Sequence, residues 1–368
     1  MVTVRSLTVW RHELELREPY SYAGATLTHI PSVIVRMQTD DGLEGWGETC
    51  PLGPTYQPAH ADGAITAIKE MAGAIVGGSA LPRQLGVRMD GALEGHRYAK
   101  AALDIAAWDI LGKSAGLPLN RLLGGALSNP VPSYYAIAPL EPDEVVRIAL
   151  DRVAEGYQAL QLKIGSGDVE QDCETVRRVW ESVPRGVSIA ADANRALLVE
   201  ETLHLSRKLA NVPIAIEQPC STAEEMRSLR GRLHHPLYWD ESTTSPSVVL
   251  DALGQGHCEG FGMKLTRVGG ITPLLGVRDM AVAKGVKLSV DDSWGGDIVA
   301  AACAHVGSTV PPKLFRGTWI CRPYLSGGYD EQGGIQVENG RITLPDGPGL
   351  GIIPNFDQFG APVFELEA

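Results

Sequence analysis

The feature that most constrains the fold is a regular alternation of short apolar runs and helical segments through the middle of the chain. Between residues 126 and 320, seven apolar runs of strand length are separated by segments with helical spacing. The apolar runs are Val131–Ile137, Ala159–Ile164, Val187–Ala191, Ile214–Ile216, Leu237–Trp239, Gly260–Met263 and Val286–Val290. The helical segments include Pro142–Glu155, Val169–Ser182, Thr222–Arg232 and Ile271–Lys284. This alternation indicates βα units in a parallel sheet, and seven or more units favour a closed barrel over an open sheet.

The rest of the chain divides into a first zone of mixed strands and helices and a turn-rich end. The first zone has strand patterns at Val2–Trp10 and Ser32–Thr39, and Gly42–Gly47 turns back into a third strand. Its helical patterns are Ala61–Gly77 and Ala99–Gly112. The turn-rich end has one hairpin-like stretch, Ile335–Leu344, and is expected to fold back on the first zone. We therefore predict a catalytic barrel over residues 126–324 and an α+β domain over 1–125 that residues 325–368 complete.

Two segments of the first zone have the composition of surface connections, which mobile lids share. They are Arg17–His29 and the Pro- and Gly-rich Thr49–His60. The second carries Tyr56 and is expected to cap the rim of the barrel.

A charged residue closes each of six successive apolar runs. These residues are Lys163, Asp192, Glu217, Asp240, Lys264 and Asp291, at steps of 29, 25, 23, 24 and 27 residues. In a parallel barrel every strand ends at the same rim, where active sites lie. Helix capping or solvation explains a single acidic residue of this kind, but capping does not explain two lysines that flank three acids. We therefore expect these side chains to converge on one site.

The middle three strand ends predict a metal site. Asp192, Glu217 and Asp240 would repel one another at one point unless a divalent cation neutralised them. Because these positions hold neither His nor Cys, the ligands favour a hard ion, Mg²⁺ first and Mn²⁺ second. Such a site keeps positions open for a substrate carboxylate, and the metal stabilises the second negative charge that forms when the α-proton leaves.

The two lysines predict acid–base chemistry. Lys163 lies one strand before the acids and Lys264 one strand after them, so they should face a bound substrate from opposite sides. A lysine base must be neutral, and we expect the metal ion and the other ammonium group to lower its pKa. A proton can then leave one face of the α-carbon while another arrives on the opposite face. This arrangement predicts racemisation or epimerisation.

On these residues the whole chain resembles the enolase superfamily, in its lysine-based muconate-lactonising and epimerase-like branch. Asp192, Glu217 and Asp240 match the three metal positions of that branch. Lys163 matches the base on its second barrel strand, and Lys264, in KLTRVGG, matches the base on its sixth. The resemblance implies an α/β fold with a (β/α)₇β TIM-like barrel and an α+β capping domain, and an even-numbered homo-oligomer.

One position departs from the pattern of the branch, which usually carries Lys-x-Lys on the second strand. This chain has Gln161 two residues before Lys163, so that lysine lacks one cationic neighbour and depends more on Mg²⁺ and Lys264. Asn194 and Glu241 follow metal ligands by two and one residues and, with Gln161, are expected to support the ligands and the base.

Aromatic residues near the strand ends indicate a cationic substrate. Trp294 follows the Asp291–Asp292 pair, Trp319 comes just after the expected eighth strand, and Tyr56 lies on the capping segment. A quaternary ammonium has no N–H to donate, so aromatic faces and a nearby carboxylate recognise it. Core packing is the alternative for any one of these rings.

Several segments resemble the amino-acid-betaine epimerases of this branch, which act on 4-hydroxyproline betaine and proline betaine and share the Gln-x-Lys departure. The segments are GWGETCPLGPTYQPAH, GHRYAKAALDIAAWD, GFGMKLTRVGG and DDSWGGDI, together with Trp319. Spacing does not choose between Asp291 and Asp292 as the substrate contact, and the resemblance favours Asp292.

We therefore expect a Mg²⁺-dependent racemase or epimerase that inverts the α-carbon of an amino-acid betaine by two-base 1,1-proton transfer through a metal-stabilised enediolate. A lyase of the same superfamily, such as a 3-hydroxyproline dehydratase or a cycloisomerase, would leave one lysine idle. A dipeptide epimerase is a third alternative, against which the aromatic residues argue. A non-catalytic betaine-binding barrel would gain nothing from two lysines.

Composition limits which partners the protein can bind and which cell compartment it can occupy. The chain has 32 Lys and Arg against 44 Asp and Glu, a net charge of −12, which argues against nucleic-acid and anionic membrane surfaces. The six cysteines form no CxxC pair, and the start MVTVRSLTVW lacks a signal-peptide pattern. We expect a cytoplasmic protein whose substrate is a small cationic carboxylate.

Overall fold

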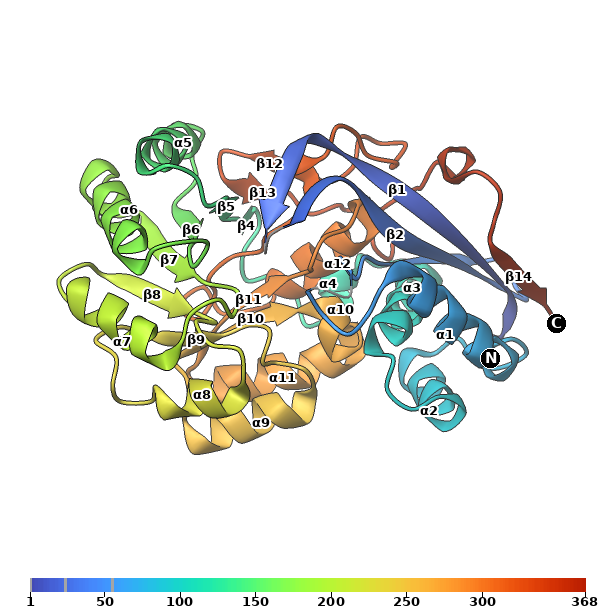
Figure 1. Ribbon diagram of the computed structural model, residues 1–368. Helices are drawn as coiled ribbons and strands as arrows, with labels where there is room; N and C mark the ends of the chain where they lie inside the picture. The colour runs from blue at the N-terminus through green and yellow to red at the C-terminus, as the bar shows by residue number, and fades with distance from the viewer. Residues whose placement is uncertain (1, 23–24, 54–55) are drawn as a thin grey trace.

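The computed structural model describes residues 2–22, 25–53 and 56–368 and consists of a cap beside a barrel (Figure 1). The cap elements are β1 (Val4–Tyr22), β2 (Ala25–Thr39), β3 (Glu44–Thr49), α1 (Ala61–Ile75), α2 (Pro82–Ala92), α3 (Arg97–Ala115) and β14 (Phe364–Glu367). Within these described ranges, no helix is both long and apolar enough to cross a membrane.

The barrel elements alternate strictly between strands and helices up to the sixth strand. They are β5 (Tyr135–Ile137), α5 (Pro142–Ala154), β6 (Ala159–Lys163), α6 (Val169–Ser182), β7 (Ser188–Asp192), α7 (Val199–Lys208), β8 (Ile214–Glu217), α8 (Ala223–Ser228), β9 (Leu237–Trp239), α9 (Pro246–Gln255), β10 (Gly260–Lys264), α10 (Leu265–Val268), α11 (Ile271–Lys284), β11 (Lys287–Asp291) and α12 (Asp297–Gly307). The connecting elements are α4 (Leu119–Leu122), β4 (Val131–Pro132), η1 (Arg322–Tyr324), β12 (Val337–Glu338), β13 (Arg341–Ile342) and η2 (Phe356–Phe359).

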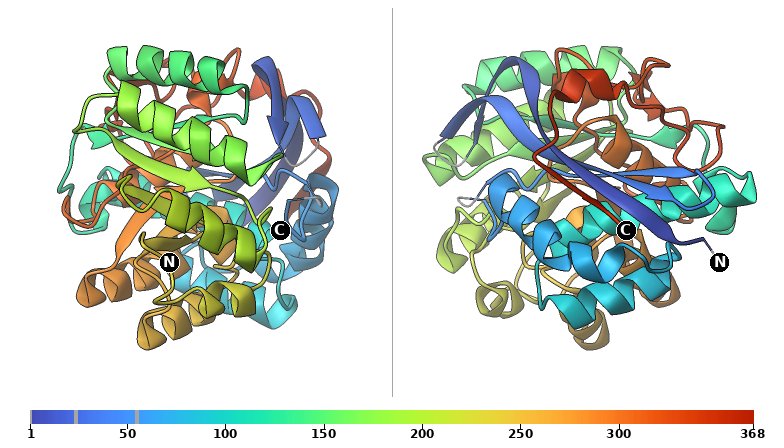
Figure 2. Two further views of the ribbon diagram at one scale, coloured as in Figure 1. Left: turned by 60° about the vertical axis from the view of Figure 1, so that its left-hand side comes forward. Right: turned by 90° about the vertical axis from the view of Figure 1, so that its right-hand side faces the viewer.

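The barrel strands form one parallel sheet in sequence order from β5 to β11, and the helices lie around its outside (Figure 2). A short segment after α12 closes the sheet, because Phe315 bridges to Leu288 of β11 and Thr318 bridges to Ser133, just before β5. The predicted (β/α)₇β barrel is therefore confirmed. The predicted strand over Val131–Ile137 is wrong in detail, since β4 pairs with the hairpin strand β13 and only β5 joins the barrel.

The cap is a four-stranded antiparallel sheet in the order β14-β1-β2-β3, so the two ends of the chain meet in one sheet. Its helices bury one apolar face against this sheet. Ile68 and Met71 of α1 and Leu103 of α3 are fully buried with Leu7 and Val35 of the strands. This packing gives the cap an apolar core of its own, separate from the core of the barrel.

The prediction of a loop over Arg17–His29 is wrong for the described part of this segment, because β1 runs to Tyr22, β2 begins at Ala25 and the two strands pair there. The alternation of charged and apolar residues in HELELRE carries the signal, since Leu14 and Leu16 are buried between exposed neighbours. The pairing shifts register between Glu15 and Tyr20, where Pro19 has no N–H to donate. Residues 23–24 of this segment, and 54–55 of the second predicted connection, lie outside the described residues.

A buried carboxylate of the cap joins it to the barrel. Glu48 of β3 is fully buried and accepts hydrogen bonds from Ser32 Oγ at 2.6 Å and Tyr329 Oη at 2.6 Å. It also accepts from the backbone N–H groups of Gly296 at 2.8 Å and Val299 at 3.1 Å, at the start of α12. A carboxylate is favourable at a helix N-terminus, so this contact fixes the β11–α12 connection against the cap.

Candidate active site

The ends of the barrel strands bring the predicted charged residues to one rim. The last residues of β6, β7, β8, β10 and β11 are Lys163, Asp192, Glu217, Lys264 and Asp291, and Asp240 directly follows β9. The parallel register sets Lys163 opposite Asp192, and Asp192 opposite Glu217. Lys264 is set opposite Asp291 in the same way.

Three of these residues form a buried acidic triad. Asp192, Glu217 and Asp240 each offer a carboxylate oxygen, and these oxygens lie within 4.8 Å of one another. Burial raises the pKa of Asp192 to about 6, with Glu217 and Asp240 adding to this effect and Lys163 opposing it. Burial acts on Asp240 too, but Lys264 and Arg267 hold its pKa below the usual value. Oxygen-only donors, fully removed from water and close enough to share one ion, fit Mg²⁺.

Gly262 of β10 leaves the space in which the triad lies. A Cβ added at this position would come within 2.9 Å of Glu217 Oε1 and 3.2 Å of the Cβ and Cγ atoms of Asp240. The Glu217 carboxylate would therefore have to shift, and the Asp240 side chain would have to give by a few tenths of an ångström.

We expect Gly262→Ala to weaken Mg²⁺ binding roughly tenfold or more, as changes in the support of metal ligands do. Calorimetric titration with Mg²⁺ measures this effect. Gly276→Ala is the matched control, because a Cβ at this helical position meets nothing within 4 Å. Equal Mg²⁺ affinities in the two variants would show that the space at Gly262 does not matter to the triad.

The two lysines flank the triad and are both held in its charge network. Lys163 Nζ donates to Asp192 Oδ2 at 2.6 Å. Lys264 Nζ lies 3.7 Å from Asp240 Oδ2 and 3.7 Å from Asp291 Oδ2. Burial lowers the pKa of both lysines, but the neighbouring carboxylates raise it by more, so that the pKa of each lysine is above its usual value. The protein groups alone thus oppose the lowering that a base needs, and that lowering depends on a cation taking up the carboxylate charge.

Two arginines near the triad were not predicted. Arg267 Nη1 donates to Asp240 Oδ1 at 2.5 Å, and Arg316 Nη2 donates to Glu217 Oε2 at 3.0 Å. Because an arginine keeps its charge at all accessible pH values, each carboxylate has a permanent counter-charge. Arg267 lies within KLTRVGG, where it could have been found, but nothing in the spacing marks Arg316.

Asn194 and Glu241, which were predicted to support the metal ligands, lie beside the acidic triad. The backbone N–H of Asn194 donates to Asp192 Oδ1 at 2.9 Å, and its side chain donates to Glu241 Oε1 at 2.9 Å. Burial raises the pKa of Glu241 to about 7. Gln218 was missed: its Oε1 accepts from the backbone N–H of Asp240 at 2.9 Å and so fixes the third strand end.

A small cavity beside the triad brings both lysines together with several aromatic rings. Its lining residues are Tyr20, Leu52, Tyr56, Tyr134, Ala136, Gln161, Lys163, Asn194, Lys264, Ser293, Trp294 and Trp319. The predicted Tyr56, Gln161, Trp294 and Trp319 are therefore in this lining. Tyr20 and Tyr134 were not predicted as site residues.

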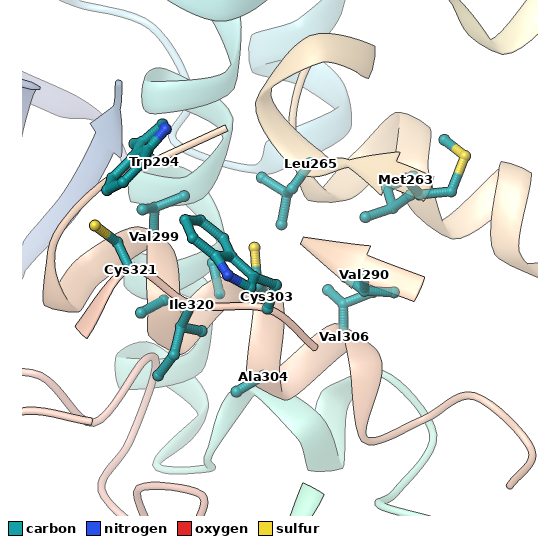
Figure 3. Packing of buried hydrophobic residues seen from close by; sticks show 14 of the residues in the cluster. Met263, Leu265, Val290, Trp294, Val299, Cys303, Ala304, Val306, Ile320 and Cys321 are labelled. Atoms are coloured by element: carbon teal, nitrogen blue, oxygen red, sulfur yellow. The ribbon is translucent and has the colours of Figure 1, made fainter. Parts of the chain in front are cut away.

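The aromatic rings form one connected cluster. Trp294 and Trp319 meet edge to face with centroids 5.4 Å apart, and Tyr20 meets Trp294 in the same way at 5.1 Å. Tyr324 lies behind them, 5.5 Å from Trp319 and 5.8 Å from Trp294. Trp294 rests on the buried side chains near Val299 (Figure 3). We call Tyr20, Trp294 and Trp319 the aromatic wall of the cavity.

The two aspartates predicted as the substrate contact both have partners within the protein. Asp291 accepts from the backbone N–H of Trp319 at 2.7 Å and lies next to Lys264. Asp292 accepts from the backbone N–H of Thr266 at 3.3 Å, and burial raises its pKa to about 7. Among the described residues that line the cavity, neither aspartate is present. Asp292 instead lines a smaller cavity that shares Trp294 and Trp319 with the first.

Comparison with known proteins covers nearly the whole chain. The family described as mandelate racemase / muconate lactonizing enzyme, N-terminal domain, matches residues 4–124, and the enolase C-terminal domain-like family matches residues 144–358. The chain belongs to the enolase superfamily. As in that superfamily, it is an enzyme with Mg²⁺ as its cofactor, and the acidic triad is where the described residues can hold the ion.

Relatives within the enolase superfamily catalyse more than one kind of reaction. A cis-3-hydroxy-L-proline dehydratase from Roseibium aggregatum is 36% identical over 98% of both chains. An L-Ala-D/L-Glu epimerase from Clostridium acetobutylicum is 26% identical over 95% of this chain and 98% of its own. A crystal structure of an enolase-superfamily member from Roseovarius nubinhibens complexed with magnesium is 32% identical, covers 100% of both chains and superposes with a TM-score of 0.95. The chain is thus related to racemases, epimerases and dehydratases of one superfamily.

Proposed function

We propose that this enzyme inverts the α-carbon of a proline-type amino-acid betaine, such as 4-hydroxyproline betaine or proline betaine. The observation that carries the proposal is the cavity lining, in which two lysines from opposite flanks of the triad meet the aromatic wall. The lysines supply two proton-transfer groups, and the aromatic wall supplies a surface for a cation without N–H groups.

The acidic triad fixes one end of the substrate. Bound at Asp192, Glu217 and Asp240, Mg²⁺ supplies electrostatic stabilisation for the negative charge that develops on the substrate carboxylate. The α-carbon then lies between β6 and β10, which carry Lys163 and Lys264. One lysine removes the α-proton from one face and the other delivers a proton to the opposite face, which inverts the centre without any net change in atoms.

The aromatic wall fixes the other end of the substrate. The polar side chains that line the cavity beside the lysines are neutral, among them Gln161, Asn194 and Ser293. Over the described lining there is no carboxylate to pair with an ammonium N–H. A quaternary ammonium has no N–H that needs a hydrogen-bond acceptor, so the aromatic face of Trp319 can bind it without a carboxylate in direct contact.

A dehydratase acting on a 3-hydroxyproline is the second candidate, and the dehydratase that is 36% identical favours it. Because both lysines line the cavity, neither need be idle in this reaction, contrary to the expectation from sequence. One lysine removes the α-proton and the other protonates the leaving 3-hydroxyl, which departs as water and leaves a carbon–carbon double bond. The same cavity and triad serve this chemistry. The difference is the fate of the second proton, which goes to oxygen rather than to carbon.

Parallel assays of purified enzyme with Mg²⁺ separate the two candidates. L-Proline betaine is followed by polarimetry, and cis-3-hydroxy-L-proline is followed by the appearance of an unsaturated ring product in proton NMR spectra. The proposal expects the higher kcat/KM with the betaine. A higher kcat/KM with cis-3-hydroxy-L-proline would replace it with the dehydratase.

If the aromatic wall binds the substrate cation, removal of the Trp319 ring should weaken betaine binding. We expect Trp319→Ala to weaken binding of L-proline betaine roughly 30-fold, the equivalent of a desolvated cation–π contact of about 2 kcal/mol. Binding of unmethylated L-proline should weaken far less, because its ammonium N–H groups can find other partners. Calorimetry measures both affinities, and Trp319→Phe is the control that keeps an aromatic face. An equal loss for both ligands would contradict the cation–π assignment.

A further inference from the structure

The N-terminal mouth of the barrel holds a second and larger cavity. It has a volume of about 790 Å³ and lies at the opposite end of the strands from the triad. The first residues of four barrel strands line it, namely Ala159 of β6, Ser188 of β7, Ile214 of β8 and Lys287 of β11. We call it the basal cavity, and neither the proton transfer nor the metal site uses it.

The charged side chains that line the basal cavity are all positive. Lys287, Lys313, Arg316 and Arg341 line it, whereas no aspartate or glutamate is found among its described lining residues. Lys287 and Lys313 are exposed and make no ion pair within the described chain. A concave surface lined by one sign of charge concentrates counter-ions, and here it does so in a chain with a net charge of −12.

Arg316 connects the basal cavity to the triad. Its side chain is 15% exposed, lines the cavity, lies 4.1 Å from the centre of the Tyr238 ring and donates to Glu217 at 3.0 Å. Another carboxylate near Tyr238, that of Glu259, is used in a hydrogen bond from the backbone N–H of Leu237 at 2.8 Å. Within the described residues, Glu217 is therefore the carboxylate that pairs with Arg316.

Only a thin layer of side chains separates the two cavities. Tyr134 and Gln161 line both the basal cavity and the cavity that holds the lysines. Gln161 therefore contributes to the walls of both cavities.

We propose that the basal cavity binds a small anion with two or more negative charges, either a phosphate-type anion or a dicarboxylate. Arg316 is the largely buried positive charge of this site, and Lys287, Lys313 and Arg341 are its exposed ones. An anion held by Arg316 competes with Glu217 for the guanidinium group, which leaves Glu217 more available to a metal ion. By reciprocity, Mg²⁺ at the triad leaves Arg316 more available to the anion.

Calorimetric titration of the enzyme with inorganic phosphate and with succinate tests the site and distinguishes the two kinds of anion. We expect the Lys287→Ser/Lys313→Ser variant to bind the preferred anion about tenfold more weakly, a loss of ~1.4 kcal/mol. The matched control is Lys69→Ser/Lys284→Ser, which removes the same charge from exposed positions outside the cavity. Absence of binding of both anions to the unmodified enzyme would overturn the proposal. An equal loss in both variants would also overturn it, by showing an effect of net charge alone.

A second titration tests the connection through Arg316. We expect saturating Mg²⁺ to raise the affinity for succinate about fivefold, at the lower end of typical coupling between sites. The Lys287→Ser/Lys313→Ser variant should bind succinate about tenfold more weakly than the unmodified enzyme in Mg²⁺ as well, whereas succinate held by Mg²⁺ at the triad would not respond to these lysines. Equal affinities with and without Mg²⁺ would refute the coupling, and a lower affinity with Mg²⁺ would reverse its sign.

Discussion

Replacing either Lys163 or Lys264 by alanine is expected to lower kcat for betaine inversion by about 10³-fold, within the range that general acid–base groups contribute. Each lysine is the only amine that its flank of the triad supplies to the described cavity lining. A two-base reaction needs both, because the first takes the α-proton and the second returns a proton to the other face. Neither lysine can therefore substitute for the other.

Deuterium exchange at the α-carbon shows which enantiomer each lysine deprotonates. Each single variant should still exchange the α-proton of one enantiomer, the one facing the remaining lysine, without inverting it. The two variants should exchange opposite enantiomers. Lys284→Ala, at an exposed position on α11, is the control and should keep full activity. A variant that still inverts at an appreciable fraction of the original rate would remove that lysine from the reaction.

Replacing one carboxylate of the triad should have the second largest effect. We expect Asp240→Asn to weaken Mg²⁺ binding at least about 100-fold, since even residues that only support metal ligands are worth 10–100-fold. Activity should fall to the level of enzyme treated with a chelator. The asparagine also leaves the buried Arg267 without its counter-charge at 2.5 Å, so some loss of stability accompanies the change.

Three measurements on the Asp240→Asn variant keep these effects apart. Calorimetry gives the Mg²⁺ affinity, polarimetry the turnover and thermal unfolding the stability. Asp279→Asn changes an exposed carboxylate in an ion pair with Arg278 and serves as the control for loss of a charge. A folded Asp240→Asn variant that binds Mg²⁺ as tightly as the unmodified enzyme would show that Asp240 is not a ligand.

The rim of the barrel could be predicted from sequence because a parallel barrel converts spacing into position. Strand ends about one βα unit apart must meet at one rim, so Lys163, Glu217 and Lys264 could be placed together without coordinates. Their residue types then specified a hard cation and two proton-transfer groups. No such rule connects Arg316 or Gln218 to the triad, since their positions depend on the closing segment and on a loop.

The substrate cavity was less predictable because it depends on contacts between the cap and the barrel. Tyr20 contacts Trp294 within the aromatic wall only because β1 extends far beyond its predicted end at Trp10. Asp292 follows the seventh strand as expected, yet it accepts a hydrogen bond from the backbone N–H of Thr266 and is not among the described residues that line the cavity. A one-residue difference along a strand end decides which side a carboxylate faces, and spacing alone does not resolve it.

Inversion requires that the enzyme remove the α-proton of a betaine from one face and return a proton to the other. Proton NMR of L-proline betaine with enzyme and Mg²⁺ in D₂O, followed by polarimetry of the same sample, measures both events. We expect loss of the α-proton signal together with decay of the optical rotation. Exchange without loss of rotation would show that no proton returns to the opposite face and would contradict inversion, and no exchange at all would contradict the betaine as substrate.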